Sequence, residues 1–264
     1  MSPDVVVGIA TLAALFALEG LLPYYQGRDH RYAHGLTNLT LALLSGAIGV
    51  ALAPVLLLTT ELAAAQGLGI RHLLGLDGLA AAVITFLLFD LWMYAWHRAN
   101  HEVAFLWRFH RVHHTDPAMD CTTALRFHPG EILLSNLANL PVLVALGMTF
   151  ETFVVYKSAM VAVILFHHSN VDVPHGLDRA LRRLVVPPSM HRVHHSEIAF
   201  ETNSNYGTVF SFWDRLFGSF RRREDLQAIR FGIGRFDERR WQRPLGLILL
   251  PFRQQSKPPV SHSP

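Results

Sequence analysis

The stretch LAAAVITFLLFDLWMYAWHRANH, from Leu79 to His101, decides the fold class of this 264-residue chain. Its apolar part, as far as Trp96, contains a single charged side chain and is long enough to cross most of a roughly 30 Å hydrocarbon core as a helix. The stretch then ends in two histidines, His97 and His101, which share one helical face with Asp90. We therefore expect a membrane helix that presents two metal-binding side chains where it leaves the membrane.

The rest of the chain has the same apolar character. Hydrophobic residues make up 51% of the sequence and charged residues 16%, and four more apolar stretches occur at 5–22, 36–59, 132–150 and 152–166. The last two are separated by little more than Glu151, so we expect a tight hairpin whose members need not both reach the far surface. The predicted fold is an all-α membrane protein with four to five transmembrane helices and a helical, histidine-rich cytosolic cap.

Composition also excludes several classes of protein. The single cysteine, Cys121, rules out an internal disulfide, a CxxC redox pair and a cysteine-ligated iron–sulfur cluster. A net charge of +3 with long apolar stretches argues against a nucleic-acid-binding protein. The short GIG at 232–234 lacks the third glycine of a dinucleotide-binding loop, so it does not indicate NAD(P)H binding.

The basic residues predict how the chain lies in the membrane. With the N-terminus outside, the segments 23–35, 97–131 and everything after residue 167 lie inside, and they hold 21 of the 23 lysines and arginines. This is the asymmetry that the positive-inside rule describes. We expect a multi-pass protein of a bacterial inner membrane with its histidines on the cytoplasmic side.

The sequence divides into four predicted regions. These are an N-terminal transmembrane region at 1–78, a histidine-rich core at 79–217 that includes the membrane hairpin 132–166, a basic cytosolic cap extension at 218–252, and a disordered tail at 253–264. Within the extension, the apolar run 245–252 is too short to span and predicts an interfacial helix. The arginines at 221–223 are expected to form a solvated face near anionic lipid head groups.

Histidine clusters carry the chemistry of this chain. The pentapeptide HRVHH occurs twice, at 110–114 and 191–195, and on a helix its three histidines point to one side. Two further clusters are RFHPGE at 126–131 and FHHSN at 166–170, and with the pair at 97 and 101 the five clusters hold eleven histidines. One metal ion cannot use more than about four to six ligands, so the count predicts two metal ions. A shell of neutral imidazoles with open coordination positions suits iron that must bind O₂.

The order of these motifs resembles a known family. HxxxH, HxxHH and HxxHH, with RFHPGE, HHSN, NYG and WDRLFG between and after them, are similar to the fatty acid hydroxylase and sterol desaturase superfamily of integral membrane di-iron oxygenases, from about Asp90 to Phe217. The resemblance implies two iron ions, with zinc able to replace iron in purified protein, and O₂ as a co-substrate. The metal ligands that it implies are His97, His101, His110, His113, His114, His168, His191, His194 and His195.

Other polar residues near these motifs are candidates for further metal ligands or for groups that orient the ligands. They are His128, His167, Asp90, Asn170 and Glu131. Asp90 is expected either to accept the N–H of a ligating histidine or to pair with an arginine at the helix end. Asn170 either positions a metal-bound water or caps a turn. Packing explains Tyr206, Gly207, Trp213 and Asp214 best, and we expect the remaining histidines at the surface: His30, His34, His72, His175 and His262.

The function implied by the resemblance is hydroxylation of an unactivated C–H bond in a lipid, with an acyl chain, a head group or a sterol-like ring as substrate. Desaturation on the same site is the alternative. Because the chain has no flavin, nicotinamide or haem motif and no cluster cysteines, it needs a separate electron donor, such as a ferredoxin or a cytochrome b5-like protein with its reductase. The arginine-rich cap is a reasonable docking face for an acidic donor.

Three other classes of protein compete with this interpretation. A membrane zinc hydrolase is the strongest, but Arg98 stands where a zincin has its general-base glutamate. A bis-histidine haem protein would place facing pairs within the membrane. A metal transporter would carry ionisable groups along its spans and not only at one end. The sequence therefore favours an oxygenase.

Overall fold

The computed structural model describes residues 2–28 and 30–253, and its regular structure is helical apart from three isolated β-bridges. The predicted all-α fold is confirmed. Of the tail predicted at 253–264, residues 254–264 lie outside the described residues. The elements are α1 (Pro3–Leu21), α2 (Arg31–Ala65), α3 (Ile70–Leu73), α4 (Gly78–Glu102), α5 (Ala104–His114), η1 (Cys121–Leu125), α6 (Pro129–Leu146), α7 (Phe150–His168), α8 (His175–Leu181), α9 (Pro188–His194), α10 (Ala199–Thr202), α11 (Phe212–Leu216), α12 (Pro244–Leu249) and η2 (Leu250–Phe252).

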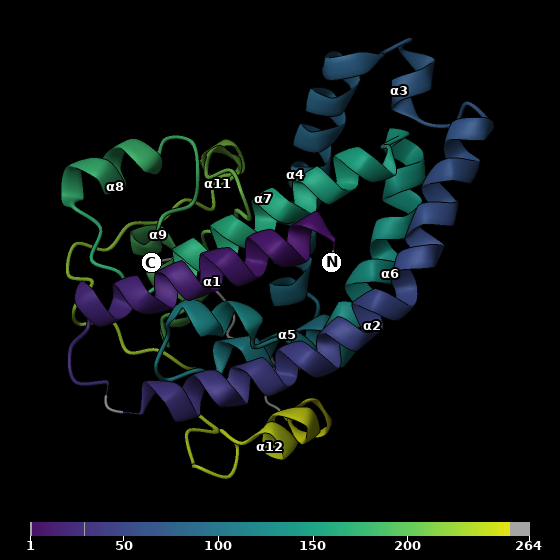
Figure 1. Cartoon of the computed structure of the whole chain (residues 1–264). Coiled ribbons are helices and arrows are strands. Elements are labelled where there is room, and N and C mark those ends of the chain that lie inside the picture. The colour runs from purple at the N-terminus through teal and green to yellow at the C-terminus, as the bar shows by residue number, and fades with distance from the viewer. Residues whose placement is uncertain (1, 29, 254–264) are drawn as a thin grey trace.

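Five of these helices, α1, α2, α4, α6 and α7, are long and apolar enough to cross a membrane. They are the long helices of Figure 1, where α1 lies beside α7 and α2 beside α6. Apolar side chains point away from the protein along them: Val50 is 76% exposed and Leu43 is 69% exposed. In water such a surface would be unfavourable, whereas lipid chains accept it.

The predicted hairpin consists of two helices of spanning length. Pro129 at the first turn, behind an N-cap at His128, starts α6, and Gly147 with φ 65° ends it. Thr149 then caps α7 by accepting a hydrogen bond from the backbone N–H of Thr152. The two helices have 18 and 19 residues, so each reaches roughly 27 Å. The helix lengths therefore support five spans, the higher of the two expected counts.

The loops that connect the long helices lie at two opposite ends of the bundle. At one end Gly69 and Gly147 touch, and a Cβ on Gly69 would lie 2.2 Å from the backbone nitrogen of Gly147. At the other end the backbone N–H of Tyr24 donates to the carbonyl of Asn170 at 2.7 Å, and Arg28 Nη1 donates to the carbonyl of Ala118 at 3.0 Å. The segments 22–28, 103–128 and 169–253 thus meet at one end, opposite α3, as Figure 1 shows, and together they form the cap.

Two buried clusters hold this end to the bundle. Leu15 of α1 and Leu165 of α7 pack with Cys121 and Ala124 of η1. Leu247 and Leu250 are fully buried against Leu41 of α2 and Val112 of α5, which fastens the C-terminal helix under the bundle. The predicted helix at 245–252 is therefore present as α12 and η2. Its other face is apolar and open, with Leu245 and Phe252 more than 70% exposed, which suits a membrane surface.

Candidate metal centre

Four helices bring nine histidines together at the cap end of the bundle. Helix α4 continues beyond its predicted apolar part to Glu102, so it carries its own histidine pair, and α5, α7 and α9 supply the others. Eight of the nine side chains are buried and His97 is half-buried. The nine are His97, His101, His110, His113, His114, His168, His191, His194 and His195.

These histidines form two separate groups, and within each group one ring nitrogen per residue lies within 4.8 Å of the others. The five-histidine group is His97, His101, His110, His114 and His194. The four-histidine group is His113, His168, His191 and His195. All nine residues expected to bind metal are thus brought together, at two positions that lie side by side.

Each HRVHH box contributes to both groups. On a helix the side chains at i and i+4 lie about 40° apart, whereas the one at i+3 lies about 60° to the other side. His110 and His114 accordingly join the five-histidine group and His113 the other. In the second box the assignment is reversed, because His191 and His195 join the four-histidine group while His194 crosses over. The two boxes therefore interlock.

The four-histidine group has the nitrogen spacing of a metal site. His168 Nε2 lies 3.0 Å from His113 Nε2 and 3.0 Å from His191 Nε2. Two nitrogens bound at about 2.1 Å to one ion and 90° apart would be separated by roughly 3.0 Å. His195 completes the group, and its ring stacks on His114 of the neighbouring group at 4.4 Å between centroids.

The five-histidine group contains buried nitrogen atoms without a partner in the described part of the chain. They are the Nε2 atoms of His101, His110, His114 and His194. A buried polar atom without a partner is unfavourable by about 1–3 kcal/mol, so four of them in one place indicate a missing ligand. The ring of His101 lies 4.7–4.8 Å from those of His110, His114 and His194, which leaves a common space between the rings. Both groups fit a metal ion.

Protein acceptors fix the tautomer of four of these imidazoles. His110 Nδ1 donates to Glu131 Oε1 at 2.7 Å, and His168 Nδ1 donates to the carbonyl of Ile164 at 2.6 Å. The remaining two donate to the 203–207 turn, as described below. Because the proton is on Nδ1, the lone pair on Nε2 points into the metal site. Glu131, predicted as a ligand or an orienting group, contacts a histidine and belongs to neither group.

Burial keeps the imidazoles neutral. It lowers the pKa of His113, His114, His191 and His195 well below 6.5, and the neighbouring imidazoles lower it further. Burial also lowers the pKa of His194, to about 3. Neutral imidazole is the form that binds metal ions, so the site is ready for metal at physiological pH.

The 203–207 turn orients two of the nine histidines, and sequence reasoning missed this role. The carbonyl of Tyr206 accepts from His97 Nδ1 at 2.9 Å, and the carbonyl of Ser204 accepts from His194 Nδ1 at 2.7 Å. Asp214 holds the turn by accepting hydrogen bonds from the backbone N–H groups of Tyr206 and Gly207. Because every residue has a backbone carbonyl, the residue types in this turn do not indicate such a contact. The NYG sequence and the nearby Asp214 indicate a turn, but not its hydrogen bonds to histidines.

Asp90 has neither of its two expected roles. Its fully buried carboxylate accepts hydrogen bonds from Tyr156 Oη, Trp213 Nε1 and the backbone N–H groups of Val209 and Phe210, at 2.8–3.2 Å. In the described part of the chain it contacts no histidine and forms no ion pair with an arginine. Four donors satisfy the charge that an arginine would otherwise have to balance. Asp90 therefore fastens the 209–213 segment to α4 and α7.

Three other expected site residues lie beside the groups and not in them. Asn170 pairs with the backbone N–H and carbonyl of Tyr25, which favours the structural one of its two expected roles. His128 caps α6 and donates to the carbonyl of Ile248 at 3.2 Å. His167 stacks on His191 with ring centroids 3.8 Å apart. His167 therefore contacts a histidine of the four-histidine group.

His34 corrects one expectation about the surface. It is half-buried, and its two ring nitrogens lie 2.8 Å from Asp116 and 2.9 Å from Asp120. The start of α2 packs against the loop before η1, which covers this histidine. His72 is likewise half-buried, whereas His30 and His175 are exposed as expected, and His262 lies outside the described residues.

Comparisons with known proteins agree with this site. The model of the family described as fatty acid hydroxylase matches residues 82–219, a segment that contains all nine histidines. The chain is 29% identical to the ornithine lipid hydroxylase OlsE of Rhizobium tropici over 222 residues, which are 81% of this chain and 66% of that protein. It is 34% identical to the alkylglycerol monooxygenase of Caenorhabditis elegans over 134 residues, 50% of this chain and 25% of the relative.

The cholesterol 25-hydroxylase of Rattus norvegicus is 27% identical over 150 residues, 54% of this chain and 47% of that protein. This chain thus spans between a quarter and two thirds of the length of these relatives. No solved structure matches it. Because the family model covers more than half of the chain and includes both histidine groups, the chain belongs to the fatty acid hydroxylase family.

Proposed function

We propose that this protein is a membrane-bound oxygenase that hydroxylates an unactivated C–H bond of a lipid. The overall reaction consumes the lipid R–H, O₂, two electrons and two protons, and it yields R–OH and water. The observation that supports it most is the pair of adjacent histidine groups, in which the buried Nε2 atoms of His101, His110, His114, His194 and His195 have no hydrogen-bond partner among the described residues. The relatives are named as hydroxylases and monooxygenases of lipids, which supports the same class of reaction.

In this proposal each histidine group holds one iron ion, and zinc can replace iron in purified protein. When bound, such a pair supplies the reductive activation of O₂. The protein's own part is to hold the ligands in one tautomer and to exclude water. Glu131, Ile164, Ser204 and Tyr206 do the first through the Nδ1 hydrogen bonds, and burial of the rings does the second.

A zinc hydrolase remains a weaker explanation. A metalloprotease-type site needs a carboxylate free to act as general base on a metal-bound water. In the described residues neither histidine group contains a carboxylate, and Glu131 is engaged by His110. Desaturation uses the same residues, and the identity of the product distinguishes it from hydroxylation.

Electrons must come from a separate protein, and a basic hollow on the cap is the proposed docking place. This hollow is a cavity of about 220 Å³ whose charged lining consists of four arginines, at 182 and 221–223, against two carboxylates, Asp178 and Glu224. Ser189, which also lines it, lies in the first turn of α9 two residues before His191. An acidic ferredoxin or cytochrome b5-like protein would be attracted to this charge and would dock near the four-histidine group. The cap would then face the cytoplasm, as the distribution of basic residues predicts.

The first experiment asks whether a lipid gains oxygen from O₂. Membranes from a bacterial host with and without the gene are incubated with ¹⁸O₂ and NADPH, and extracted lipids are analysed by mass spectrometry. We expect one lipid class heavier by one ¹⁸O atom only when the gene is present. Unsaturated products without label would instead mean desaturation, and the absence of any oxidised lipid would refute both.

A second experiment tests the donor. Replacing Arg221 and Arg222 by glutamate should reduce NADPH-driven turnover in membranes while leaving turnover with a small chemical reductant intact. Equal loss of both would mean that the hollow is not the docking place.

A further inference from the structure

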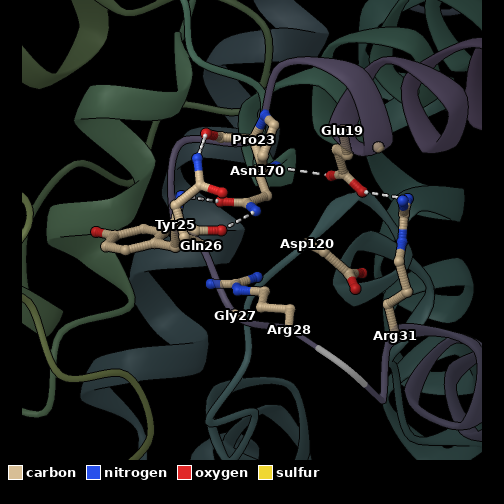
Figure 2. A pocket seen from close by; sticks show the side chains of 10 residues that line it. Glu19, Pro23, Tyr25, Gln26, Gly27, Arg28, Arg31, Asp120 and Asn170 are labelled. Atoms are coloured by element: carbon tan, nitrogen blue, oxygen red, sulfur yellow. Dashed lines mark hydrogen bonds and ion pairs between the residues drawn. The ribbon is translucent and has the colours of Figure 1, made fainter.

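A cavity of about 170 Å³ lies outside the histidine groups, where α1 ends and α2 begins (Figure 2). Among the described residues, its charged lining consists of two carboxylates, Glu19 and Asp120, and two guanidinium groups, Arg28 and Arg31. Neutral residues make up the rest of its wall. The formal charges cancel, so the cavity suits a ligand that itself carries one charge of each sign.

Three of the four charges already have partners of opposite sign. Arg31 lies 3.5 Å from Glu19, and Asp120 lies 2.9 Å from His34. Glu19 also accepts hydrogen bonds from the backbone N–H groups of Cys121 and Asn170, so it is held rigidly in place. Carboxylate oxygens accept about two hydrogen bonds each, and among the described residues Asp120 Oδ2 is hydrogen-bonded only to His34. This oxygen retains capacity for a ligand.

Arg28 is the exception. Its Nη1 donates to the carbonyls of Ala118 and Met119, and within the described residues it forms no ion pair. Figure 2 shows its guanidinium among the side chains that line the cavity, below Asn170 in this view. Burial lowers the pKa of this side chain, and the carboxylates of Asp120, Asp116 and Glu19 offset that effect only in part. A guanidinium presents two parallel N–H groups that match a carboxylate or a phosphate.

The cavity lies at the depth of lipid head groups. Helix α1 has 19 residues and is roughly 28 Å long, close to the thickness of the hydrocarbon core. The loop segment 22–28 that follows it therefore lies at the membrane surface. The cavity is also close to the metal centre along the chain, because Asn170 follows His168 by two residues and Asp120 lies in the loop that follows α5.

We propose that this cavity binds the zwitterionic head group of the lipid substrate, with its anionic group on Arg28 and its ammonium group toward Asp120 and Glu19. The proposal rests on the proposed function and names the substrate class. A carboxylate and a phosphate are equivalent in this recognition, so an aminoacyl lipid and phosphatidylethanolamine share the required chemistry. Uncharged lipids and lipids with only a negative charge do not.

The test compares Arg28→Gln, Arg28→Lys and, as a matched control, Arg230→Gln, whose side chain is 83% exposed on the cap. Incorporation of ¹⁸O is measured in detergent micelles with four lipids: an aminoacyl zwitterion, phosphatidylethanolamine, phosphatidylglycerol and an alkylglycerol. We expect the wild type to prefer one or both zwitterions. Arg28→Gln should raise KM for the preferred zwitterion about ten- to hundredfold with little change in kcat. The KM of Arg28→Lys should lie between the KM values of the wild type and Arg28→Gln, because lysine keeps the charge and lacks the paired N–H groups. The control should behave as the wild type.

A second readout does not depend on turnover. Lysophosphatidylethanolamine or the lyso form of the aminoacyl lipid should raise the thermal unfolding temperature of the wild type, and Arg28→Gln should lose that shift while keeping its metal content. An unchanged KM in Arg28→Gln, or equal preference for phosphatidylglycerol, would overturn the head-group proposal. If the wild type binds the zwitterion but oxidises none of the four lipids, the proposed function fails and the binding site stands.

Discussion

The sharpest prediction concerns the second HRVHH box, whose three histidines look equivalent in the sequence. In the structure His191 and His195 belong to the four-histidine group, whereas His194 belongs to the five-histidine group. The double variant His191→Ala/His195→Ala leaves only two imidazoles in its group, fewer than the three or four protein ligands that metal sites of this kind use. His194→Ala leaves four in the other group. We therefore expect bound metal to fall from about two ions per chain to about one in the double variant, and to stay near two in His194→Ala.

The assay is metal content by mass spectrometry of detergent-purified protein, with protein measured by amino-acid analysis. His175→Ala serves as the control because that side chain is exposed and outside both groups. Replacing His191 and His195 by glutamine, which is closer in volume, separates loss of a ligand from loss of packing. The reasoning is refuted if the double variant keeps both ions or loses both, or if His194→Ala alone loses one.

Three further predictions follow from single contacts. Glu131→Gln, which removes the charge that accepts from His110, should weaken metal binding 10- to 100-fold in a chelator competition, and unchanged affinity would contradict the orienting role. Burial raises the pKa of Asp214 from 3.8 to about 6, so the folded chain binds the extra proton between these values. Stability should fall by about 3 kcal/mol as pH rises through that window, at 1.36 kcal/mol per pKa unit, and Asp214→Asn should lose this dependence in chemical unfolding curves. Gly69→Ala should lower the unfolding temperature, because its Cβ would meet the backbone of Gly147; an unchanged temperature would mean that the two loops can separate freely.

The fold class and the members of the site could be predicted because each depends on local sequence. Apolar runs of membrane-spanning length identify helices whatever lies beside them, and the nine clustered histidines stand out by number and spacing. The roles of Asp90 and Asn170 could not be predicted. Both bind segments more than a hundred residues away, Asp90 at Val209 and Asn170 at Tyr25, and no spacing rule indicates such partners.

The sequence by itself determined that this chain is a membrane-spanning helical protein with enough histidines at one end for two metal ions. Only the tertiary structure decided which histidine serves which group. The i+3 position of a box points about 100° away from its i+4 position, so the partner of each ring depends on which helix faces it. His113 crosses to α7 and α9 in this way, and His194 crosses to α4 and α5. Helix packing divides two identical pentapeptides in opposite ways between two sites.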